Sequence, residues 1–318
     1  MREFVIQENE ANQRLDKYLK KLFVNASSGF LYKMLRKKNI TLNGKKADGS
    51  EMLQKGSCIR VFFSEETILK FMQDSNLLEK EYERLKGLPM KGLKVIYEDA
   101  DVLVADKPAN MLSQKAKEND VSANEYLLGY LMREGSLTPE IFKTFRPSVC
   151  NRLDRNTTGI LLMGKTLAGS QKLSESLRDR SMQKYYRAIV LGHIEQAKHL
   201  SGWLVKNEVT NQVQVLEQEE KGAVRIETSY EPISYGKDVT LLEIHLITGK
   251  SHQIRAHLAS IGAPIIGDKK YGNAKVNQKY YEQLHVTHQL LHAYRLSFPD
   301  GQTILAPVPT IFSSLLQE

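Results

Sequence analysis

Apolar residues follow two different periods along this chain, and the change of period divides it. Residues 15–23 carry the stripe of an amphipathic helix, made by Leu15, Tyr18, Leu19, Leu22 and Phe23. The sequence NASSGF interrupts the stripe, and a second short helix follows. Asn43-Gly44 predicts a tight turn between short extended pieces, and SCIRVFF predicts a closing strand. Residues 1–63 are therefore expected to form a small domain of two helices and a sheet.

From residue 93 onward, short apolar runs and alternations typical of strands dominate. The predicted strands have the sequences LKVIYED, DVLVADKP, GILLMGKT, KYYRAIVLG, AVRIETSYEPIS, VTLLEIHLITG and LLHAYRLSFP. Two helices are predicted, with the sequences LAGSQKLSESLRD and SHQIRAHLASIG. Because strands mostly follow strands, we expect residues 91–318 to adopt an α+β fold with a mixed, largely antiparallel sheet.

Residues 64–90 separate these two patterns. They mix both charge signs with scattered apolar residues and end at Gly87 and Pro89. We expect a partly helical linker that lets the two domains move independently.

Length and composition are those of an ordinary two-domain protein. The chain has 318 residues, of which 41% are hydrophobic and 26% charged. It contains no apolar run long enough to span a bilayer, and its first residues lack the apolar centre of a secretory signal. Cys58 and Cys150 are its two cysteines, so a disulfide framework and a cysteine-based zinc site are not expected. The cytoplasm is the simplest location.

Positive charge is concentrated at the front of the chain. The net charge is +8, and residues 1–63 hold 13 Lys and Arg against 6 Asp and Glu. A compact basic domain indicates a polyanionic partner, of which nucleic acid is the usual one.

The sequence GILLMGKT matches the phosphate-loop pattern of nucleotide-binding proteins. A phosphate loop follows a strand and cradles phosphate with flexible backbone, whereas the variable positions here form an apolar run. Residues 159–166 therefore predict a buried strand, and nucleotide hydrolysis is kept only as an alternative.

Asp154 lies in a polar stretch just before that strand, between Arg152 and Arg155. Neighbouring guanidinium groups favour the charged carboxylate, which can act as a nucleophile, a general base or an electrostatic stabiliser. A structural salt bridge is the alternative for the same residues.

Four blocks, NRLDRNTTGILLMGKT, KYYRAI, TGKSHQIRAHLASIGAPIIGDKKYG and LLHAYRLSFP, resemble in order the signature blocks of the RluA family of pseudouridine synthases. The resemblance covers about residues 93–310. It implies an enzyme that isomerises uridine to pseudouridine in RNA without a cofactor or a metal. The carboxylate would add to the sugar or base, or would take a proton from the sugar to give a glycal.

The resemblance also implies roles for individual residues. Asp154 would be the catalytic residue, and Tyr186 would pack against the target base. Arg255 would pair with the carboxylate, and Arg152 would enter the space left by the flipped nucleotide. Leu291 would supply an apolar wall for the uracil.

Two positions depart from the family pattern, and one alternative site remains. Asn151 stands where the family has His, and Thr158 stands where it has Ser. His285, His288 and His292 would share a face if their segment were helical, and zinc accepts such ligands. Because LLHAYRLSFP predicts a strand, a metal site is not expected.

The front domain has a resemblance of its own. The blocks RLDKYL, KKNITLNGKKA and LQKGSCIRVF, in residues 13–63, resemble the RNA-binding domain first seen in ribosomal protein S-four. It implies a phosphate-facing surface formed by Lys33, Arg36, Lys37, Lys38, Lys45 and Lys46. The basic loop GDKKYG, residues 267–272, is either a further backbone contact or a plain surface turn.

The combined hypothesis is a monomeric enzyme that modifies ribosomal RNA, with transfer RNA as the second possible substrate and no membrane or small-molecule partner. The alternative is a non-catalytic RNA-binding or ribosome-assembly protein that retains the fold.

Overall fold

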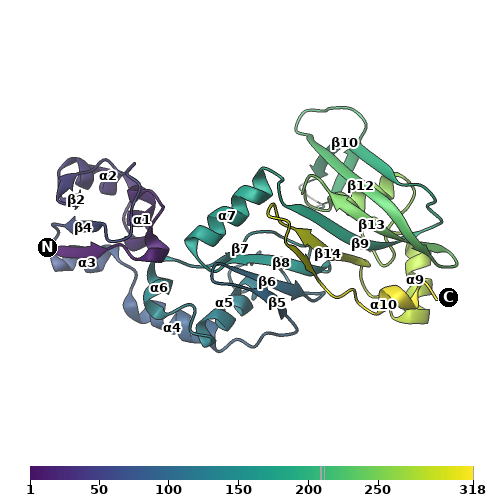
Figure 1. Ribbon diagram of the computed structural model, residues 1–318, viewed down its shortest axis with the longest axis horizontal. Coiled ribbons are helices and arrows are strands. Elements are labelled where there is room, and N and C mark those ends of the chain that lie inside the picture. The colour runs from purple at the N-terminus through teal and green to yellow at the C-terminus, as the bar shows by residue number, and fades with distance from the viewer. Residues whose placement is uncertain (208–209, 211, 318) are drawn as a thin grey trace.

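The computed structural model describes residues 1–207, 210 and 212–317. It is elongated, with the N-terminal part at one end and the C-terminus at the other (Figure 1). The N-terminal part holds these elements: β1 (Arg2–Val5), a short 3-10 helix (Glu8–Glu10), α1 (Leu15–Leu22), α2 (Ser28–Arg36), β2 (Ile40–Leu42), β3 (Lys45–Lys46) and β4 (Cys58–Val61). Its strands form an antiparallel sheet in the order β1-β4-β2-β3.

In the N-terminal part, the helix and the turn that local sequence patterns predict are both present. The apolar side of α1 is buried, and Asn43-Gly44 joins β2 to β3 with positive φ at both residues, 50° and 75°. The second helix begins earlier than NASSGF suggests, because Ser27 caps it by accepting a hydrogen bond from the backbone N–H of Phe30. Strand β1 was not predicted.

The segment interpreted as a linker forms two helices, α3 (Glu65–Phe71) and α4 (Ser75–Lys86). Ile68 of α3 is buried in the core of the N-terminal part. Leu78, Tyr82 and Leu85 of α4 are buried in a core of the larger part, where Tyr82 Oη donates to the carbonyl of Leu137 at 2.8 Å. The segment is thus packed against both parts rather than extended between them.

A single sheet organises the larger part, and its strands run in the order β11-β10-β12-β13-β9-β14-β8-β6-β5. Two short strands complete it, since β7 pairs with β8 and β15 with β14. The strands are β5 (Lys94–Glu98), β6 (Val102–Lys107), β7 (Ser148–Val149), β8 (Thr158–Gly164), β9 (Gln183–Leu191), β10 (Lys198–Asn207), β11 (Gln212–Leu216), β12 (Val224–Tyr235), β13 (Val239–Leu246), β14 (Leu291–Ser297) and β15 (Thr303–Leu305). Among the described strands only β14 and β8 pair in parallel, so the predicted α+β class with a mixed, largely antiparallel sheet is confirmed.

The parallel pairing of β14 with β8 is a short seam between two halves of the sheet. It consists of two residue pairs, His292 with Thr158 and Ala293 with Gly159. Gly159 has φ of 104°, and a Cβ there would lie 2.2 Å from the carbonyl oxygen of Ala293. The seam therefore requires glycine at this position.

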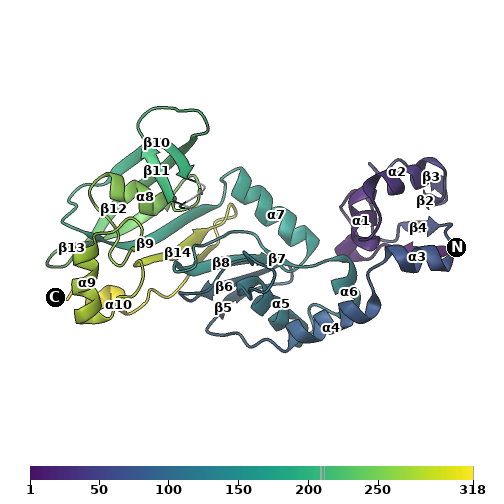
Figure 2. The same ribbon diagram turned by 180° about the vertical axis from the view of Figure 1, so that it is seen from behind.

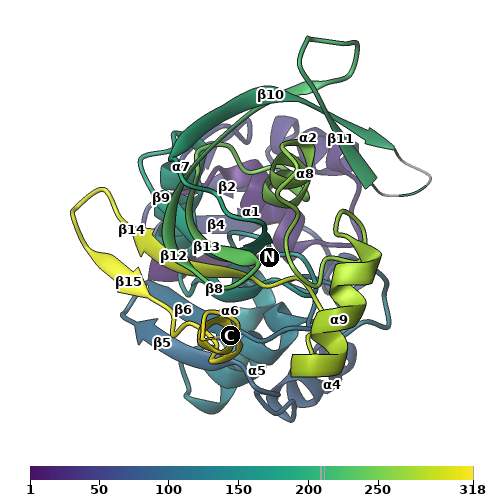
Figure 3. The ribbon, with the colours of Figure 1, turned by 90° about the vertical axis from the view of Figure 1, so that its right-hand side faces the viewer.

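The remaining helices are α5 (Ala123–Arg133), α6 (Pro139–Thr144), α7 (Leu167–Arg178), α8 (Gln253–Ser260), α9 (Ala274–Leu284) and α10 (Ile311–Ser314). Helices cover both faces of the sheet (Figure 2). Helices α4, α5 and α6 pack on the β5–β6–β8 half, whereas α8 and α9 lie on the other half. Seen end-on, strands β9, β13, β12 and β10 curve around α8 (Figure 3).

The predicted strands and both predicted helices of the larger part are confirmed within a few residues. Helices α5, α6 and α9 and the β10–β11 hairpin were not predicted. Among the described residues, no helix is both long and apolar enough to cross a membrane.

Candidate active site

A cleft of about 940 Å³ opens beside the seam, and Asp154 lies in its wall. Its lining comes from the loop before β8, the end of α7, β9, β12 and the segment that enters α8. Among the described lining residues there is one carboxylate, Asp154. The Lys and Arg residues of the lining are Lys115, Arg152, Arg155, Arg178, Arg180, Lys184, Arg225, Lys250 and Arg255. Such a cleft attracts a polyanion and places one acid within it.

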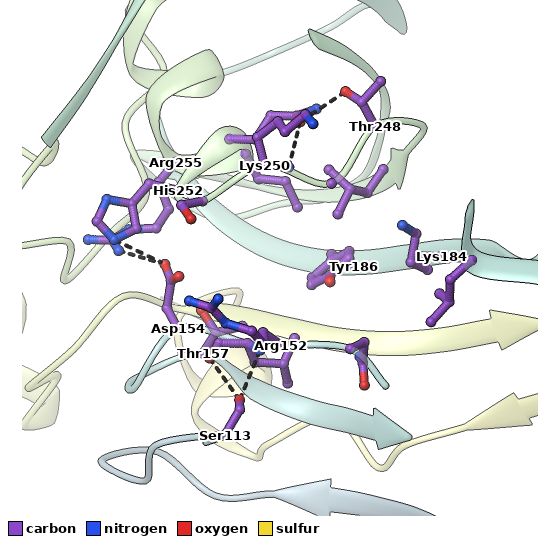
Figure 4. Close-up of a pocket in the computed structure, with 18 of the residues that line it drawn as sticks. Ser113, Arg152, Asp154, Thr157, Lys184, Tyr186, Thr248, Lys250, His252 and Arg255 are labelled. Carbon is purple, nitrogen blue, oxygen red and sulfur yellow. Dashed lines mark hydrogen bonds and ion pairs between the residues drawn. The ribbon is translucent and has the colours of Figure 1, made fainter. Parts of the chain in front are cut away.

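Asp154 is partly buried, with a quarter of its side chain exposed. Arg255, from α8, donates through Nη1 to Asp154 Oδ2 at 2.7 Å, and this pair joins residues 101 positions apart (Figure 4). The flanking cations Arg152 and Arg155 are exposed, and within the described chain neither forms an ion pair with Asp154. The residue that holds the carboxylate is therefore Arg255, as the family resemblance implied, and not the sequence neighbours.

Backbone contacts fix the loop that carries Asp154. Ser113 Oγ donates to the carbonyl of Leu153 and accepts from the N–H of Leu153, both at 2.9 Å. The N–H of Thr157 donates to the carbonyl of Asp154 at 3.1 Å and closes a turn. The carboxylate therefore projects from a loop that these hydrogen bonds hold in place, which favours a single orientation.

Lys107, fully buried at the end of β6, supports the same loop. Its Nζ donates to the carbonyl oxygens of Pro108, Met111 and Arg155 at 2.9, 2.9 and 3.0 Å. Burial lowers the pKa of Lys107 to about 7, although the charges of Asp154 and Asp106 oppose this shift. The ammonium has three donors and uses all three on this framework.

Behind Arg255 lies a second carboxylate that the sequence analysis missed. Asp268 has no exposed side-chain area and accepts from Arg255 Nε and Nη2 at 2.7 and 2.9 Å. Burial alone would raise the pKa of Asp268, but the hydrogen bonds and charge of Arg255 hold it below its usual range. Asp268 belongs to GDKKYG, so the two expectations for this loop, a backbone contact or a plain surface turn, omit its buried acid.

His252 is a further neighbour of the carboxylate that was not predicted. It caps α8 in the left-handed conformation, with φ of 55°, and its Nε2 lies 3.9 Å from Asp154 Oδ2. Its Nδ1 hydrogen-bonds to Tyr271 Oη at 2.9 Å. Burial lowers the pKa of His252 against the attraction of Asp154, which favours a neutral imidazole. The strained backbone is the kind of feature found at functional sites.

Tyr186 and Leu291 line the same cleft on neighbouring strands, β9 and β14. Both are buried, with 7% and 4% exposed. Burial and the charge of Asp154 raise the pKa of the Tyr186 phenol well above its ordinary value, so the ring remains neutral. The structure thus brings together Asp154, Arg255, Tyr186, Leu291 and Arg152 as lining residues of one cleft.

Asn151 and Thr158, the two residues that depart from the family pattern, both form side-chain hydrogen bonds. Asn151 Nδ2 donates to the carbonyl of Ile160 at 3.1 Å, and its Oδ1 accepts from the N–H of Leu162 at 2.7 Å. Thr158 Oγ1 hydrogen-bonds across the seam to His292 Nδ1 at 2.8 Å. Both side chains therefore serve the backbone and the seam beside the loop.

The alternative sites do not form. Residues 158–164 are strand β8, Lys165 Nζ contacts Glu98 Oε1 at 2.6 Å and Thr166 caps α7, so no phosphate loop exists. His292 is buried in β14 and His285 ends α9, so the three histidines do not share a helix. In the described chain no three His, Cys, Asp or Glu side chains are grouped to hold a metal ion.

The basic residues of the front domain lie outside this cleft. Lys33, Arg36, Lys37, Lys38, Lys45 and Lys46 are all exposed on α2, the turn after it and β3. These residues, called the cationic surface of the front domain, belong to the N-terminal part, which lies at the opposite end of the molecule from the C-terminus (Figure 1).

The sequence of this chain is similar to a family model and to proteins of other organisms. The family model described as RNA pseudouridylate synthase matches residues 101–260. An uncharacterized RNA pseudouridine synthase of Mycoplasma genitalium is 30% identical over 98% of this chain and 93% of its own. The ribosomal large subunit pseudouridine synthase D of Nitrosomonas europaea is 28% identical over 99% of this chain and 87% of its own.

Two solved structures have a fold similar to that of this chain. The human RNA pseudouridylate synthase domain containing 4 protein superposes with a TM-score of 0.57 and 21% identity over 76% of this chain and 95% of its own. The human RNA pseudouridylate synthase domain containing 1 protein gives a TM-score of 0.55 and 20% identity over 69% of this chain and 85% of its own.

Proposed function

Because the chain belongs to the RNA pseudouridylate synthase family, we propose that its cleft isomerises a uridine of large-subunit ribosomal RNA and that Asp154 is the catalytic group. The reaction breaks the glycosidic bond to a ring nitrogen, turns the uracil and forms a carbon–carbon bond. Substrate and product have the same atoms, so no oxidant or energy source is required. The observation that carries the proposal is one carboxylate, fixed by Arg255, in a cleft whose other charged lining residues in the described chain are cationic.

Asp154 has one carboxylate oxygen available for chemistry. Arg255 and His252 both approach Oδ2, and no described donor contacts Oδ1. Arg255 holds the carboxylate in one orientation, and Asp154 lines the cleft. This arrangement supports either attack on the substrate or removal of a proton from the sugar.

Three other lining residues would hold the flipped nucleotide. Tyr186 is neutral and largely buried, and its ring would pack against the detached uracil. Leu291 would close the apolar side of that pocket. Arg152, exposed at the rim, is free to enter the space that the nucleotide leaves and to stack on bases.

We favour ribosomal RNA over transfer RNA because relatives named as large-subunit enzymes match over nearly the whole chain. The exposed cations of the front domain would bind phosphates away from the target and so position a large RNA. A ribosomal substrate is also the reason to expect the enzyme in the cytoplasm. We also propose that the enzyme acts as a monomer.

Pseudouridine mapping on an unmodified large-subunit ribosomal RNA transcript tests the proposal. We expect the wild type to modify defined uridines and Asp154→Asn to lower kcat at least 10³-fold, because the catalytic group is lost. Asp238→Asn, at an exposed ion pair with Lys279, is the control and should keep full activity. Equal modification by Asp154→Asn would reject the catalytic assignment. RNA binding without modification by the wild type would favour the non-catalytic alternative.

A further inference from the structure

Lys184 occupies a second charged position in the cleft, on the same strand as Tyr186. Residues 184 and 186 point to the same face of β9, and both line the cleft (Figure 4). Lys184 lies beyond Tyr186 on the side away from Asp154. Its side chain is partly buried, and its Nζ reaches within 3.3 Å of where a Cβ on Gly249 would be. The ammonium is therefore held against the segment that leads into α8.

This ammonium has no counter-ion among the residues that the structure describes. In the part of the chain that the structure describes, Lys184 Nζ has no hydrogen-bond or ion-pair partner. Burial lowers the pKa of Lys184, and the like charge of Arg180 lowers it further. A partly desolvated cation beside another cation is unfavourable unless an anion joins them.

The second cation is held by a turn of fixed geometry. Arg180 has φ of 64°, in the turn between α7 and β9. Asp179 stabilises this turn by accepting from the N–H of Ser181 at 2.9 Å. The guanidinium of Arg180 is exposed and, among the described residues, unpaired, so the turn presents it at the mouth of the cleft beside Lys184.

We propose that Lys184 and Arg180 form a phosphate-binding subsite for the RNA backbone next to the target uridine. The inference rests on the proposed function for the identity of the ligand. Strand geometry places the Cα atoms of residues 184 and 186 about 7 Å apart, a separation that one nucleotide can bridge. A uracil against Tyr186 would therefore bring an adjoining phosphate to Lys184. The phosphate relieves the repulsion between the two cations and fixes the direction in which the strand crosses the cleft.

Three variants separate charge from packing. Lys184→Met keeps the apolar stem and removes the charge, whereas Lys184→Arg keeps the charge. Lys250→Met is the matched control, because Lys250 lines the same cleft but is exposed. The substrate is a short RNA hairpin that carries a uridine mapped in the ribosomal transcript. It is made with natural phosphates or with a neutral methylphosphonate on the 5′ or the 3′ side of that uridine.

We expect Lys184→Met to raise KM about 10- to 100-fold on natural RNA while kcat changes less than threefold, and Lys184→Arg to restore most of the loss. One of the two methylphosphonates should raise the KM of the wild type by a similar factor and leave that of Lys184→Met unchanged. Lys250→Met should respond to methylphosphonate as the wild type does. If the 5′ and the 3′ methylphosphonate each raise the KM of Lys184→Met by the same factor as that of the wild type, the effects are additive and the subsite is rejected.

A second measurement does not depend on catalysis. Inorganic phosphate, compared with chloride at equal ionic strength, should raise the Tm of the full-length wild type and of Lys184→Arg more than that of Lys184→Met. The same rise in all three would refute an anion site at Lys184. A rise specific to the charged variants, without pseudouridine formation by the wild type, would leave the anion site standing and reject the proposed function.

Discussion

The two ends of the cleft differ in how their charges are balanced. At the Asp154 end, Asp154, Arg255 and Asp268 alternate in sign and are joined by three hydrogen bonds of 2.7 to 2.9 Å. At the Lys184 end, Lys184 and Arg180 repel each other, and no described acid among the lining residues offsets them. The first end is complete within the protein, whereas the second requires a ligand to complete it.

The difference in charge balance corresponds to two functions within one site, reaction and substrate binding. A reacting group must be in place before the substrate arrives, so its neighbours are fixed by buried ion pairs and backbone hydrogen bonds. A binding group gains affinity when its partner comes from the ligand, because the free protein has not already satisfied it. Charge balance therefore distinguishes the chemical end of the cleft from its positioning end.

The largest effect on this contrast is expected from Asp268→Asn, which removes the buried partner of Arg255. We expect the free energy of unfolding to fall by about 3 kcal/mol, since a buried pair is broken, and kcat to fall because Arg255 no longer holds Asp154. The folded state lowers the pKa of Asp268, so its stabilisation is present above the ordinary carboxyl pKa of about 4 and is lost as the pH falls below it.

Urea unfolding from pH 7 to pH 3 measures this effect. The difference between wild type and Asp268→Asn should be constant down to about pH 5 and shrink below about pH 4. The exposed pair at Asp238 supplies the comparison, and Asp238→Asn should change stability by less than about 1 kcal/mol. A pH-independent difference for Asp268→Asn would contradict the ion pair.

Lys107→Met tests the support of the Asp154 loop and should have the next largest effect. The folded state lowers the pKa of Lys107 to about 7, so between about pH 7 and pH 10 the unfolded chain binds more protons than the folded chain. The stability of the wild type should therefore gain on the order of 1–2 kcal/mol between pH 7 and pH 9 from this residue. Lys107→Met should lose this gain, and the exposed control Lys172→Met should retain it. Identical pH profiles for all three proteins would show that the lysine does not titrate in this range.

The smallest effect concerns the cationic surface of the front domain, far from both ends of the cleft. Combined Lys33→Gln, Lys37→Gln and Lys45→Gln should flatten the slope of log K for RNA binding against log salt by about 2, since each phosphate contact contributes about 0.7 to 0.9. The value of kcat should not change. Exposed Lys80 and Lys86 on the adjoining α4, changed to Gln, provide the control. An unaltered salt slope in the triple variant would remove this surface from RNA binding.

The sequence was most informative where a local pattern determines structure. The stripe in α1, the Asn43-Gly44 turn and the alternation in β9 follow from short-range periodicity, and all three form. The pairing of Asp154 with Arg255 came from family resemblance, because no local pattern connects residues 101 positions apart.

Other features depend on burial, which one sequence does not reveal. Asp268 stands among lysines and glycines in GDKKYG, and only the packing of α8 shows that it lies under Arg255. The full burial of Lys107 has no signal in DVLVADKP, and the left-handed conformation of His252 has none in SHQIRAH. The flanking arginines of Asp154 suggested a local ion pair, but the loop turns both of them toward solvent.

The seam between β14 and β8 has a consequence for synthesis of the chain. Strand β14 begins at residue 291, so more than 120 residues separate the end of β8 from the strand that joins the two halves of the sheet. During translation, which adds about 5–20 residues per second, the half with β5, β6, β7 and β8 is made first, and Thr158 and Gly159 of β8 still lack their strand partner. The wall that carries Leu291 is absent until β14 has been synthesised, so a nascent chain should acquire the ability to modify RNA only after that point.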